Sequence, residues 1–585
     1  MIRTKVICTI GPSVNSFESI CKLIEAGMDV ARLNFSHGTH VEHAQVIEWI
    51  KAARSKLDVP IAIMLDTKGP EIRLKAIQHG EVFLPVGHRW KLVKEEVLGD
   101  KSRVSITPSQ IVDRLSVGTK ILFDDGYISS TVVQVDEEGV IVETENGGVV
   151  RSGKGVNIPN TSLGLPAFSE KDVEDIRFGC RNGIDMIAAS FVRSVEHVLA
   201  IKKLLYEEKS SHILIIAKIE NHEGVQNFDS IVQIADGIMI ARGDLGVEVP
   251  LAEVPKLQKM MIRKAYLAGK TVGTATQMLE SMIQNPRPTR AEVSDVANAI
   301  YDGTSAVMLS GETAVGKHPF ATVKIMRSIV KEAEQDIEYK RFFDLHAELV
   351  YHDVPSSITL AAVKTAYSSN AKAIFAFTSS GATARTLSRL RPSMPIIAMT
   401  PHIWCYHQLA CEWGVFPFIG KECNTMDEAF TLLSSYALSH SFVSEGDLVV
   451  VTGGAPFGIS GTTNVMLLES IGNVLVRGQP GKGEKVTGKI SLALSPESRL
   501  PFTVHGHLLV ITACNKSYLP LLEECSGIIL QNLVDDKDSE DYAHHIAEKL
   551  QKPFIVRADG AVKVLREGQL VTLEPSKGLV YKGVI

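Results

Sequence analysis

The chain opens with a unit in which an apolar run is followed by a polar tip and then by an amphipathic segment. The run Val6–Ile10 is apolar and rich in β-formers, and Gly11 with the proline after it ends the run. Apolar residues then recur at helical spacing over Phe17–Ile24. Asn15, with Glu18 three residues later, resembles a capping box and predicts that a helix begins there.

The same strand pattern recurs along the first half of the chain. Continuous apolar runs of this length are typical of strands that are buried on both faces of a parallel sheet. Eight strand-and-helix units favour a (β/α)₈ barrel, whose active site lies at the carboxyl ends of its strands. The seven further predicted strands are Val30–Phe35, Pro60–Leu65, Met186–Val192, Leu214–Ile219, Gly237–Ala241, Thr271–Ala275 and Ala306–Leu309.

Residues 71–166 break this pattern. They contain short alternating runs such as Val132–Val135 and Val140–Val142, and Asn146-Gly147 is a hairpin signal. A small all-β domain is therefore predicted here, inserted after the third barrel strand. The barrel itself is predicted over residues 1–70 and 167–340.

A different α/β pattern follows the barrel, over residues 341–475. Residues 476–485 are rich in Gly and Lys with few apolar side chains, which predicts a linker. Residues 486–585 are predicted to form an extra C-terminal domain. Candidate strands in these two parts are Ala373–Phe377, Ile396–Met399, Leu448–Val451, His507–Thr512, Gly527–Leu530 and Pro553–Val556.

The composition of the chain limits the classes of protein to which it can belong. With 585 residues, 45% of them hydrophobic and 22% charged, the chain is expected to form several globular domains. The net charge of -6 gives no sign of the basic face of a nucleic-acid binder, and no apolar run approaches membrane-spanning length. The 8 scattered cysteines, without a C-x-x-C pair, are expected to be reduced, which favours a cytoplasmic protein.

The chemistry is concentrated at the predicted strand ends. Since residues i and i+2 of a strand face the same way, Arg32 is expected to lie beside Asn34, and Lys218 beside Glu220. Asp244 follows the sixth strand. Two carboxylates suit Mg²⁺, and fixed cations suit the charge of a transferring phosphoryl group. A single Lys-x-Glu pair is ordinarily a surface ion pair, but the gathering of such groups at one rim favours a phosphoryl-transfer site.

These tips resemble the pyruvate kinase family, and the resemblance covers most of residues 1–475. It implies an α/β fold, namely a (β/α)₈ TIM barrel with an inserted small β-barrel lid domain, an α/β effector-binding domain and an extra C-terminal α/β domain. The matching stretches are TKVICTIGP, VARLNFSHGTH, MLDTKGPEIR, KGVNIPN, AASFVR, AKIENHEGV, ARGDLGVEVP, TATQMLESMI, NPRPTRAEVSDVANAIYDGTSAVMLSGETA and SGATARTLSRLRP.

The resemblance implies transfer of the phosphoryl group of phosphoenolpyruvate to ADP, giving pyruvate and ATP in the final step of glycolysis. Arg32 would bind the phosphoryl group and Lys218 would stabilise it in transfer. Glu220 and Asp244 would hold Mg²⁺ or Mn²⁺. The substrate carboxylate would be bound by Gly243, Asp244 and Thr276. The enolate would receive its proton along a path formed by Thr276, Ser310 and Glu312. ADP would be bound by Arg73, Lys154, Asn34 and His37.

A monovalent-cation site is implied as well. Its ligands would be Asn34, Ser36, Asp66 and the backbone carbonyl of Thr67. The acidic Glu71 resembles family members that require K⁺, whereas a lysine there resembles members that do not. Potassium dependence is therefore expected.

Regulation is expected in the α/β domain. The loop containing Thr378, Ser379, Ser380, Gly381 and Thr383 precedes a helix predicted to start near Ala384, and a Ser/Thr-rich loop of this kind can be an ordinary helix cap. In the family this loop holds the phosphate of an allosteric effector, and Thr462-Thr463 would help to form the pocket. The sequence leaves open whether the effector is a sugar bisphosphate, a sugar monophosphate or AMP. A homotetramer is also implied.

The last domain resembles the extra C-terminal domain of some bacterial pyruvate kinases, which is similar to a phosphohistidine swivelling domain. The position of the phosphorylated histidine falls on Tyr542, while His544 and His545 lie at a different offset and no T-S-H-A motif is present. We expect a structural or assembly role for this domain.

The residue pattern leaves two other functions to consider. One is a metal-dependent carbon–carbon lyase on a related barrel, which would not need Lys154 or the cation site. The other is a regulatory paralogue without catalysis, which the loss of Lys218, Arg32 or a metal carboxylate would favour. All of these residues are present.

Overall fold

The computed structural model describes residues 1–161, 163–347, 353–456, 462–498 and 504–584. The chain divides into two compact units. The first contains residues 1–363, 376–426 and 452–465, and the second contains residues 364–375, 427–451 and 466–585. The candidate active site lies within the first unit.

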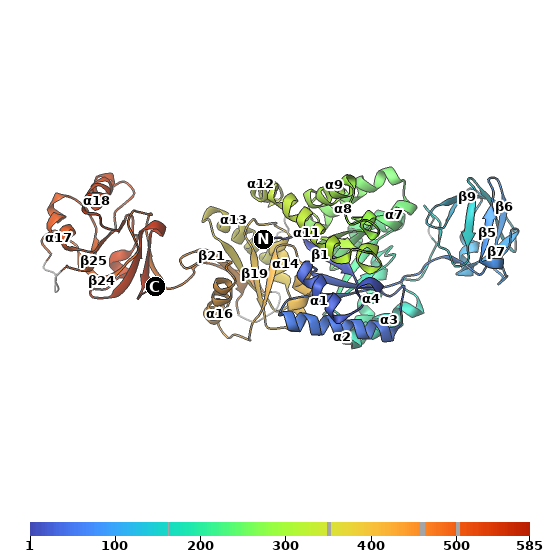
Figure 1. Cartoon of the computed structure of the whole chain (residues 1–585), viewed down its shortest axis with the longest axis horizontal. Coiled ribbons are helices and arrows are strands. Elements are labelled where there is room, and N and C mark those ends of the chain that lie inside the picture. The colour runs from blue at the N-terminus through green and yellow to red at the C-terminus, as the bar shows by residue number, and fades with distance from the viewer. Residues whose placement is uncertain (162, 348–352, 457–461, 499–503, 585) are drawn as a thin grey trace. The chain divides into compact units, whose positions relative to one another are not determined.

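The eight predicted barrel strands are confirmed, and they close into a barrel in the order β1-β17-β16-β15-β14-β13-β3-β2. Figure 1 shows helices around this part of the chain, with β1 labelled among them. All neighbouring pairs are parallel. The strands are β1 Lys5–Thr9, β2 Val30–Asn34, β3 Ala62–Asp66, β13 Met186–Ala189, β14 Leu214–Ile219, β15 Gly237–Ala241, β16 Thr271–Ala275 and β17 Ala306–Leu309.

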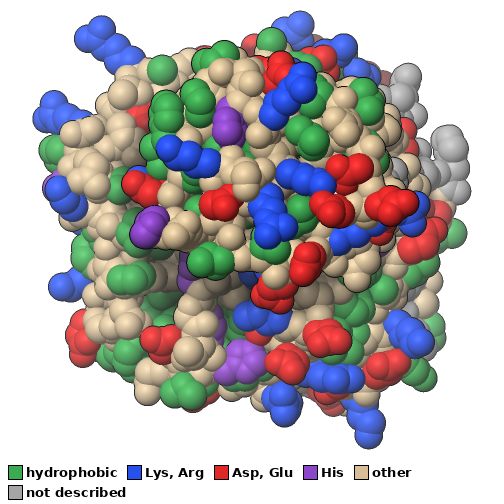
Figure 2. Space-filling view, turned by 90° about the vertical axis from the view of Figure 1, so that its right-hand side faces the viewer, with side chains coloured by type: hydrophobic (Ala, Val, Ile, Leu, Met, Phe, Trp, Pro, Cys, Tyr) green, Lys and Arg blue, Asp and Glu red, His purple; other side chains and the backbone are tan. Residues whose placement is uncertain are grey.

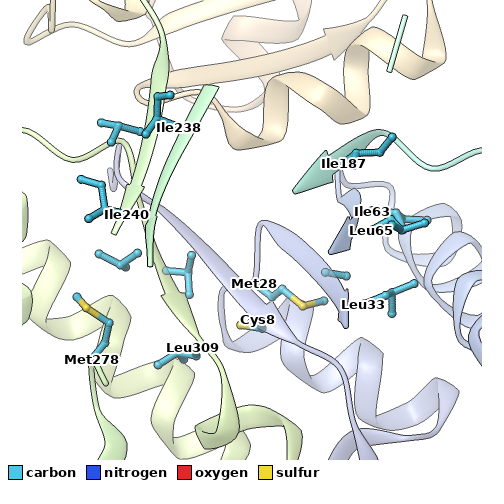
Figure 3. Close-up of a cluster of buried hydrophobic side chains, with 14 of the residues drawn as sticks. Cys8, Met28, Leu33, Ile63, Leu65, Ile187, Ile238, Ile240, Met278 and Leu309 are labelled. Atoms are coloured by element: carbon cyan, nitrogen blue, oxygen red, sulfur yellow. The ribbon is translucent and has the colours of Figure 1, made fainter. Parts of the chain in front are cut away.

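Alternate residues of each strand face opposite sides of the barrel wall. Ile63 and Leu65 belong to the cluster that packs against the helices, and Figure 3 shows them beside Ile187. Ala62 and Met64 belong instead to the cluster inside the barrel. Burying each such aliphatic side chain contributes roughly 1.5–3 kcal/mol to folding. The alternation continues past the strand ends, so polar residues in step with the interior positions point into the barrel mouth.

Helices surround these strands. Helix α1 begins one residue later than predicted, because the side chain of Ser16, not Asn15, accepts a hydrogen bond from a backbone N–H, that of Ser19. Gly27 ends this helix in the left-handed conformation. The barrel helices are α1 Phe17–Ala26, α2 His40–Leu57, α3 Glu170–Arg181, α4 Val195–Glu207, α6 Phe228–Ile234, α8 Val254–Leu267, α9 Arg290–Tyr301 and α11 Pro319–Gln335, with α5 His222–Gln226, α7 Arg242–Glu248 and α10 Gly311–Ala314 at the strand tips.

The inserted segment at residues 71–166, which is called the lid below, is built mainly of β-strands, as predicted. Rather than a closed β-barrel, its described strands form a seven-stranded sheet, β12-β8-β9-β10-β6-β7-β4, and a two-stranded sheet, β11-β5. The hairpin predicted at Asn146-Gly147 is wrong, because β11 pairs with β5 and not with β10. The strands are β4 Arg73–Leu74, β5 Glu81–Leu84, β6 Arg89–Val93, β7 Arg103–Thr107, β8 Lys120–Phe123, β9 Ile128–Val135, β10 Gly139–Thr144, β11 Gly148–Arg151 and β12 Val156–Asn157.

The predicted α/β region contains a five-stranded sheet in the order β20-β19-β18-β21-β22. Each of the three strands predicted here is present. Its elements are α12 Tyr339–His346, α13 Val354–Ser368, β18 Ala373–Phe377, α14 Ala382–Ser388, β19 Ile396–Thr400, α15 Ile403–Gln408, β20 Val415–Ile419, α16 Met426–Ser439, β21 Leu448–Gly454 and β22 Thr463–Ser470.

The C-terminal part carries a seven-stranded sheet, β23-β29-β28-β24-β25-β26-β27. The segment predicted as a linker is bonded to this part, since Gly478 N donates to Gly578 O at 2.8 Å and Gln479 N donates to Val556 O at 2.7 Å. Backbone hydrogen bonds do not depend on apolar side chains, so composition could not show this pairing. The elements are β23 Val474–Arg477, β24 Val486–Ala493, β25 His507–Ile511, α17 Leu519–Glu524, β26 Gly527–Leu530, α18 Lys537–Leu550, β27 Phe554–Ile555, α19 Ala561–Val564, β28 Leu570–Glu574 and β29 Leu579–Lys582.

Charges of both signs are interspersed over the described part of the face shown in Figure 2. Among the described residues, no helix combines the length and apolar character that a membrane crossing requires.

Candidate active site

A network of charged side chains fills the mouth of the barrel. Arg32 Nε donates to Asp66 Oδ2 at 2.6 Å, and Lys218 Nζ donates to Asp66 Oδ1 at 3.0 Å. Lys218 also lies 2.9 Å from Glu220 Oε1. Burial acts to raise the pKa of Asp66, but the charges of Arg32 and Lys218 hold it below its ordinary value. Burial likewise acts to lower the pKa of Lys218, and Asp66 and Glu220 raise it overall, so this ammonium group stays charged.

Ser190, at the end of β13, is a site residue that the sequence analysis did not single out. Lys218 Nζ donates to Ser190 Oγ at 2.7 Å, and Ser190 Oγ donates to the backbone oxygen of Thr67 at 2.6 Å. Ser190 therefore joins Lys218, the residue predicted to stabilise the phosphoryl group, to one of the predicted cation ligands. It lies within the AASFVR stretch, but a single serine at a strand end carries no chemical signal of its own.

Glu220 and Asp244 offer a carboxylate pair for a divalent metal. Burial raises the pKa of Glu220 to about 7 against the opposing charge of Lys218, and the nearby charge of Asp244 adds to the rise. Burial raises the pKa of Asp244 as well. A bound cation would relieve this mutual repulsion, so the donor set fits a hard divalent ion. No group of three or more His, Cys, Asp or Glu ligands is found in the described residues.

The turn after β15 is fixed by hydrogen bonds to residues at the end of the neighbouring strand, β16. Gly243 N donates to Thr276 Oγ1 at 2.8 Å, so the structure brings together two of the residues predicted for the substrate carboxylate. Arg242, which the sequence analysis also missed, pairs with both oxygens of Asp295, at 2.8 and 2.7 Å, and donates to Thr276 O at 2.9 Å. Thr276 adopts a φ of 69°, a strained left-handed conformation for a β-branched residue, which these contacts hold in place.

Ser310 and Glu312 also lie close together. Glu312 is completely buried, and its carboxylate accepts hydrogen bonds from Ser310 N at 2.7 Å and Leu279 N at 3.1 Å. These are the contacts of a carboxylate that shapes the tip of β17.

The predicted cation ligands lie on the adjacent tips of β2 and β3. Asn34 and Asp66 are register partners in the sheet, and Ser36 N donates to Asn34 Oδ1 at 3.1 Å. The amide, hydroxyl, carboxylate and carbonyl oxygens of this group are the donor types that a hard monovalent cation takes.

The predicted ADP residues divide into two groups. Arg73 and Lys154 line a cavity of about 690 Å³ together with Asp244. His37 and Asn34 are not among its lining residues. Within the lid, Arg73 Nη1 donates to Gly153 O at 2.7 Å, and Lys154 pairs with Asp124 at 2.8 Å.

The predicted effector loop borders a second cavity, of about 400 Å³. Thr378, Ser379, Ser380 and Thr383 line it, and Thr462 and Thr463 lie on it as well. Helix α14 begins at Ala382, two residues before the predicted start. Gly381 caps it with a φ of 84°, and its N–H donates to Thr378 Oγ1 at 2.9 Å, so Gly381 shapes the loop rather than lining the cavity.

In the C-terminal part, Tyr542, His544 and His545 all lie on α18. His544 packs edge-on against Phe554, with ring centroids 4.8 Å apart.

Comparison with known proteins decides the family. The model "Pyruvate kinase, barrel domain" matches residues 1–323, and "Pyruvate kinase, alpha/beta domain" matches residues 356–468. The chain belongs to the pyruvate kinase family. It is an enzyme that transfers the phosphoryl group of phosphoenolpyruvate to ADP, giving pyruvate and ATP, as the sequence predicted. This activity excludes the two alternatives, the carbon–carbon lyase and the regulatory paralogue without catalysis.

The relatives extend beyond the two matched domains. Pyruvate kinase from Geobacillus stearothermophilus is 43% identical over 583 residues, covering 99% of this chain and 99% of that protein. Pyruvate kinase from Staphylococcus aureus (strain USA300) is 41% identical over 586 residues, covering 100% and 99%. A crystal structure of a pyruvate kinase from Cryptosporidium parvum has a TM-score of 0.78 at 38% identity, over 80% of this chain and 96% of that one.

Proposed function

We propose that Arg32 and Lys218 receive the phosphoryl group of phosphoenolpyruvate at the barrel mouth. Both side chains are at least nine-tenths buried, so their charges act in a medium of low dielectric. Both are fixed by Asp66 before substrate arrives, which spares reorganisation when charge develops on the transferring group. Gly243, Asp244 and Thr276 orient the substrate carboxylate.

Glu220 and Asp244 would hold Mg²⁺ or Mn²⁺. When bound, the divalent ion offsets the negative charge of the phosphoryl and carboxylate groups. The two side chains bring the ion beside Lys218, with which Glu220 already pairs at 2.9 Å.

Arg73 and Lys154 would contact the ADP phosphates across the cavity that they share with Asp244. His37 and Asn34 complete the proposed nucleotide contacts. The lid would exclude water that competes with ADP for the phosphoryl group. Thr276, Ser310 and Glu312 form the proposed route by which the enolate gains a proton, with Glu312 holding the backbone of Ser310 in place.

Asn34, Ser36, Asp66 and the carbonyl of Thr67 would hold K⁺. Asp66 then serves two functions, since its oxygens already accept from Arg32 and Lys218. The cation and the two basic side chains share one carboxylate, so occupancy of the cation site is coupled to the geometry of the phosphoryl site.

The loop at Thr378, Ser379, Ser380, Gly381 and Thr383 would bind a phosphorylated small-molecule effector in the cavity of about 400 Å³. Activation curves with a sugar bisphosphate, a sugar monophosphate and AMP identify it, and no response to any of the three would overturn this part of the proposal. We also propose a cytoplasmic homotetramer in which residues 486–585 have a structural or assembly role, without phosphotransfer.

The observation that carries the proposed residue roles is the buried network in which Asp66 bridges Arg32 and Lys218. Its test is the rate of pyruvate formation from phosphoenolpyruvate and ADP, measured with Mg²⁺ and K⁺ each omitted in turn. Turnover that requires both ions supports the two cation sites. Full turnover without one of them would overturn the site assigned to that ion.

A further inference from the structure

The buried carboxylate of Asp172 lies where the lid joins the barrel. Its side chain is completely buried, on the first turn of α3. Asp172 Oδ1 accepts a hydrogen bond from Gly69 N at 3.0 Å. Asp172 Oδ2 accepts from Ser169 N at 2.8 Å and from Ser169 Oγ at 2.7 Å. The chain leaves the barrel through Gly69 after β3 and returns to it through Ser169, so this carboxylate ties the two connecting segments together.

Gly69 is fixed from its other side as well. Its φ is +75°, and a Cβ atom there would come within 2.8 Å of Phe191 Cδ2 and 2.9 Å of Ser190 Cβ. The backbone therefore passes between α3 and the tip of β13 without room for a side chain. Two residues earlier lies Thr67, whose carbonyl is a proposed K⁺ ligand.

Lys171, the residue next to Asp172 on α3, contacts the second strand tip of the proposed cation site, that of β2. Lys171 Nζ donates to Phe35 O at 2.9 Å and pairs with Asp175 at 2.6 Å. Phe35 lies between the proposed ligands Asn34 and Ser36. Its own N–H donates to Asp66 O at 3.0 Å, and its ring stacks on His43 with centroids 4.0 Å apart.

We infer that Lys171 and Asp172 are positioning residues that set the affinity of the enzyme for its monovalent cation and couple the cation site to the lid connections. The inference rests on the proposed K⁺ site. A cation that exchanges its hydration shell for protein oxygens needs those oxygens at fixed positions, and these two adjacent residues fix both backbone tips that supply them. Neither residue contacts the proposed substrate groups.

The test is the K⁺ concentration that gives half-maximal activity, with tetramethylammonium chloride holding ionic strength constant. Asp172→Asn keeps the shape of the side chain but places an amide N–H₂ against an N–H donor. We expect the half-saturating K⁺ concentration to rise about tenfold, while kcat at saturating K⁺ changes less than about threefold. Glu174→Gln, an exposed substitution on the same helix, is the matched control and is expected to change neither value.

A second readout is independent of turnover. We expect K⁺ to raise the melting temperature of the wild type in the absence of substrates, with a midpoint concentration that Asp172→Asn shifts upward by the same factor. Lys171→Met alters a half-exposed side chain, so it tests the inference even if Asp172→Asn does not fold. A K⁺-dependent wild type with unshifted midpoints in the variants would overturn the inference. A wild type that does not respond to K⁺ would overturn the proposed cation site and this inference with it.

Discussion

Lys218 Nζ lies 3.0 Å from Asp66 Oδ1, and this ion pair joins the β14 tip to the β3 tip inside the barrel. Asp66 is also the partner of Arg32 and a proposed ligand of K⁺. One carboxylate thus connects the side chains proposed to bind the phosphoryl group with the proposed monovalent-cation site. A substitution at one of these two proposed sites is therefore expected to change ligand binding at the other.

Ser190→Ala should weaken both sites. It removes the hydroxyl that accepts from Lys218 at 2.7 Å and donates to Thr67 O at 2.6 Å. With two buried polar groups each losing a partner, we expect kcat to fall about tenfold and the half-saturating K⁺ concentration to rise. Steady-state kinetics at varied K⁺ measure both. Ser211→Ala, at an exposed serine, is the control, and kinetics identical to it would contradict the role of Ser190.

Gly69→Ala should damage the site through a steric clash. The new Cβ would lie 2.8 Å from Phe191 Cδ2 at a φ of +75°. Gly87→Ala provides a matched comparison, because Gly87 has a φ of +72° with no atom within 4 Å of the new Cβ. Both variants carry the strain of a left-handed alanine, about 1 kcal/mol, but only Gly69→Ala also moves the strand tips. We expect at least a tenfold larger loss of kcat/KM in Gly69→Ala. Equal losses of kcat/KM in the two variants would contradict this prediction, because they would show that the residues after β13 move aside for the new Cβ without affecting the site.

Glu71→Lys tests the expectation that an acidic residue here accompanies K⁺ dependence. Glu71 pairs with Arg73 at 2.5 Å and lines the same cavity as Asp244. A lysine would place an ammonium group where the Glu71 carboxylate now lies, and this charge is expected to replace the one that the proposed K⁺ would supply. We expect the variant to keep a much larger share of its activity when K⁺ is replaced by tetramethylammonium. An unchanged ratio of activities with and without K⁺ would count against the expectation.

The stability of the first unit should fall on acidification through His407, on α15. Burial lowers the pKa of His407 from 6.5 to about 3, and Arg54 adds to the effect. The folded-state pKa lies below the unfolded one, so this contribution to stability is full above pH 6.5 and is lost as the pH falls toward 3. At pH 5 the loss is about 2 kcal/mol.

His407→Gln removes this titration. The drop in melting temperature between pH 7 and pH 5 should therefore be smaller in the variant than in the wild type. His440→Gln, at an exposed histidine, should behave as the wild type does. A drop of the same size in all three proteins would refute the role given to His407.

The barrel could be predicted because its strands are buried on both faces, which leaves continuous apolar runs along the chain. Arg32, Lys218, Glu220 and Asp244 could be found because charged groups at the ends of such runs are unusual. Ser190 and Arg242 could not, since their roles depend on which strand tips become neighbours. Arg242 meets Asp295 across 53 positions of sequence.

Pairing between distant segments also limited what could be predicted elsewhere. Asn146-Gly147 has the composition of a hairpin turn, yet β11 pairs with β5, whose residues lie 64 to 70 positions earlier in the chain. The Gly-rich segment at 476–485 has the composition of a linker, yet its backbone bonds to residues near the C-terminus. In both cases the deciding partners lie outside the local window that a sequence pattern describes.

The most direct test of the central claim couples pyruvate formation to NADH oxidation for the wild type and Lys218→Met, with phosphoenolpyruvate, ADP, Mg²⁺ and K⁺ all saturating. Lys203→Met, at an exposed lysine on α4, is the matched control. We expect wild type and control to turn over equally and Lys218→Met to lose about 10²–10³-fold in kcat, as when one fixed charge that stabilises a transition state is removed. Turnover of Lys218→Met within about threefold of the wild type would contradict the assignment of Lys218 as the group that stabilises phosphoryl transfer.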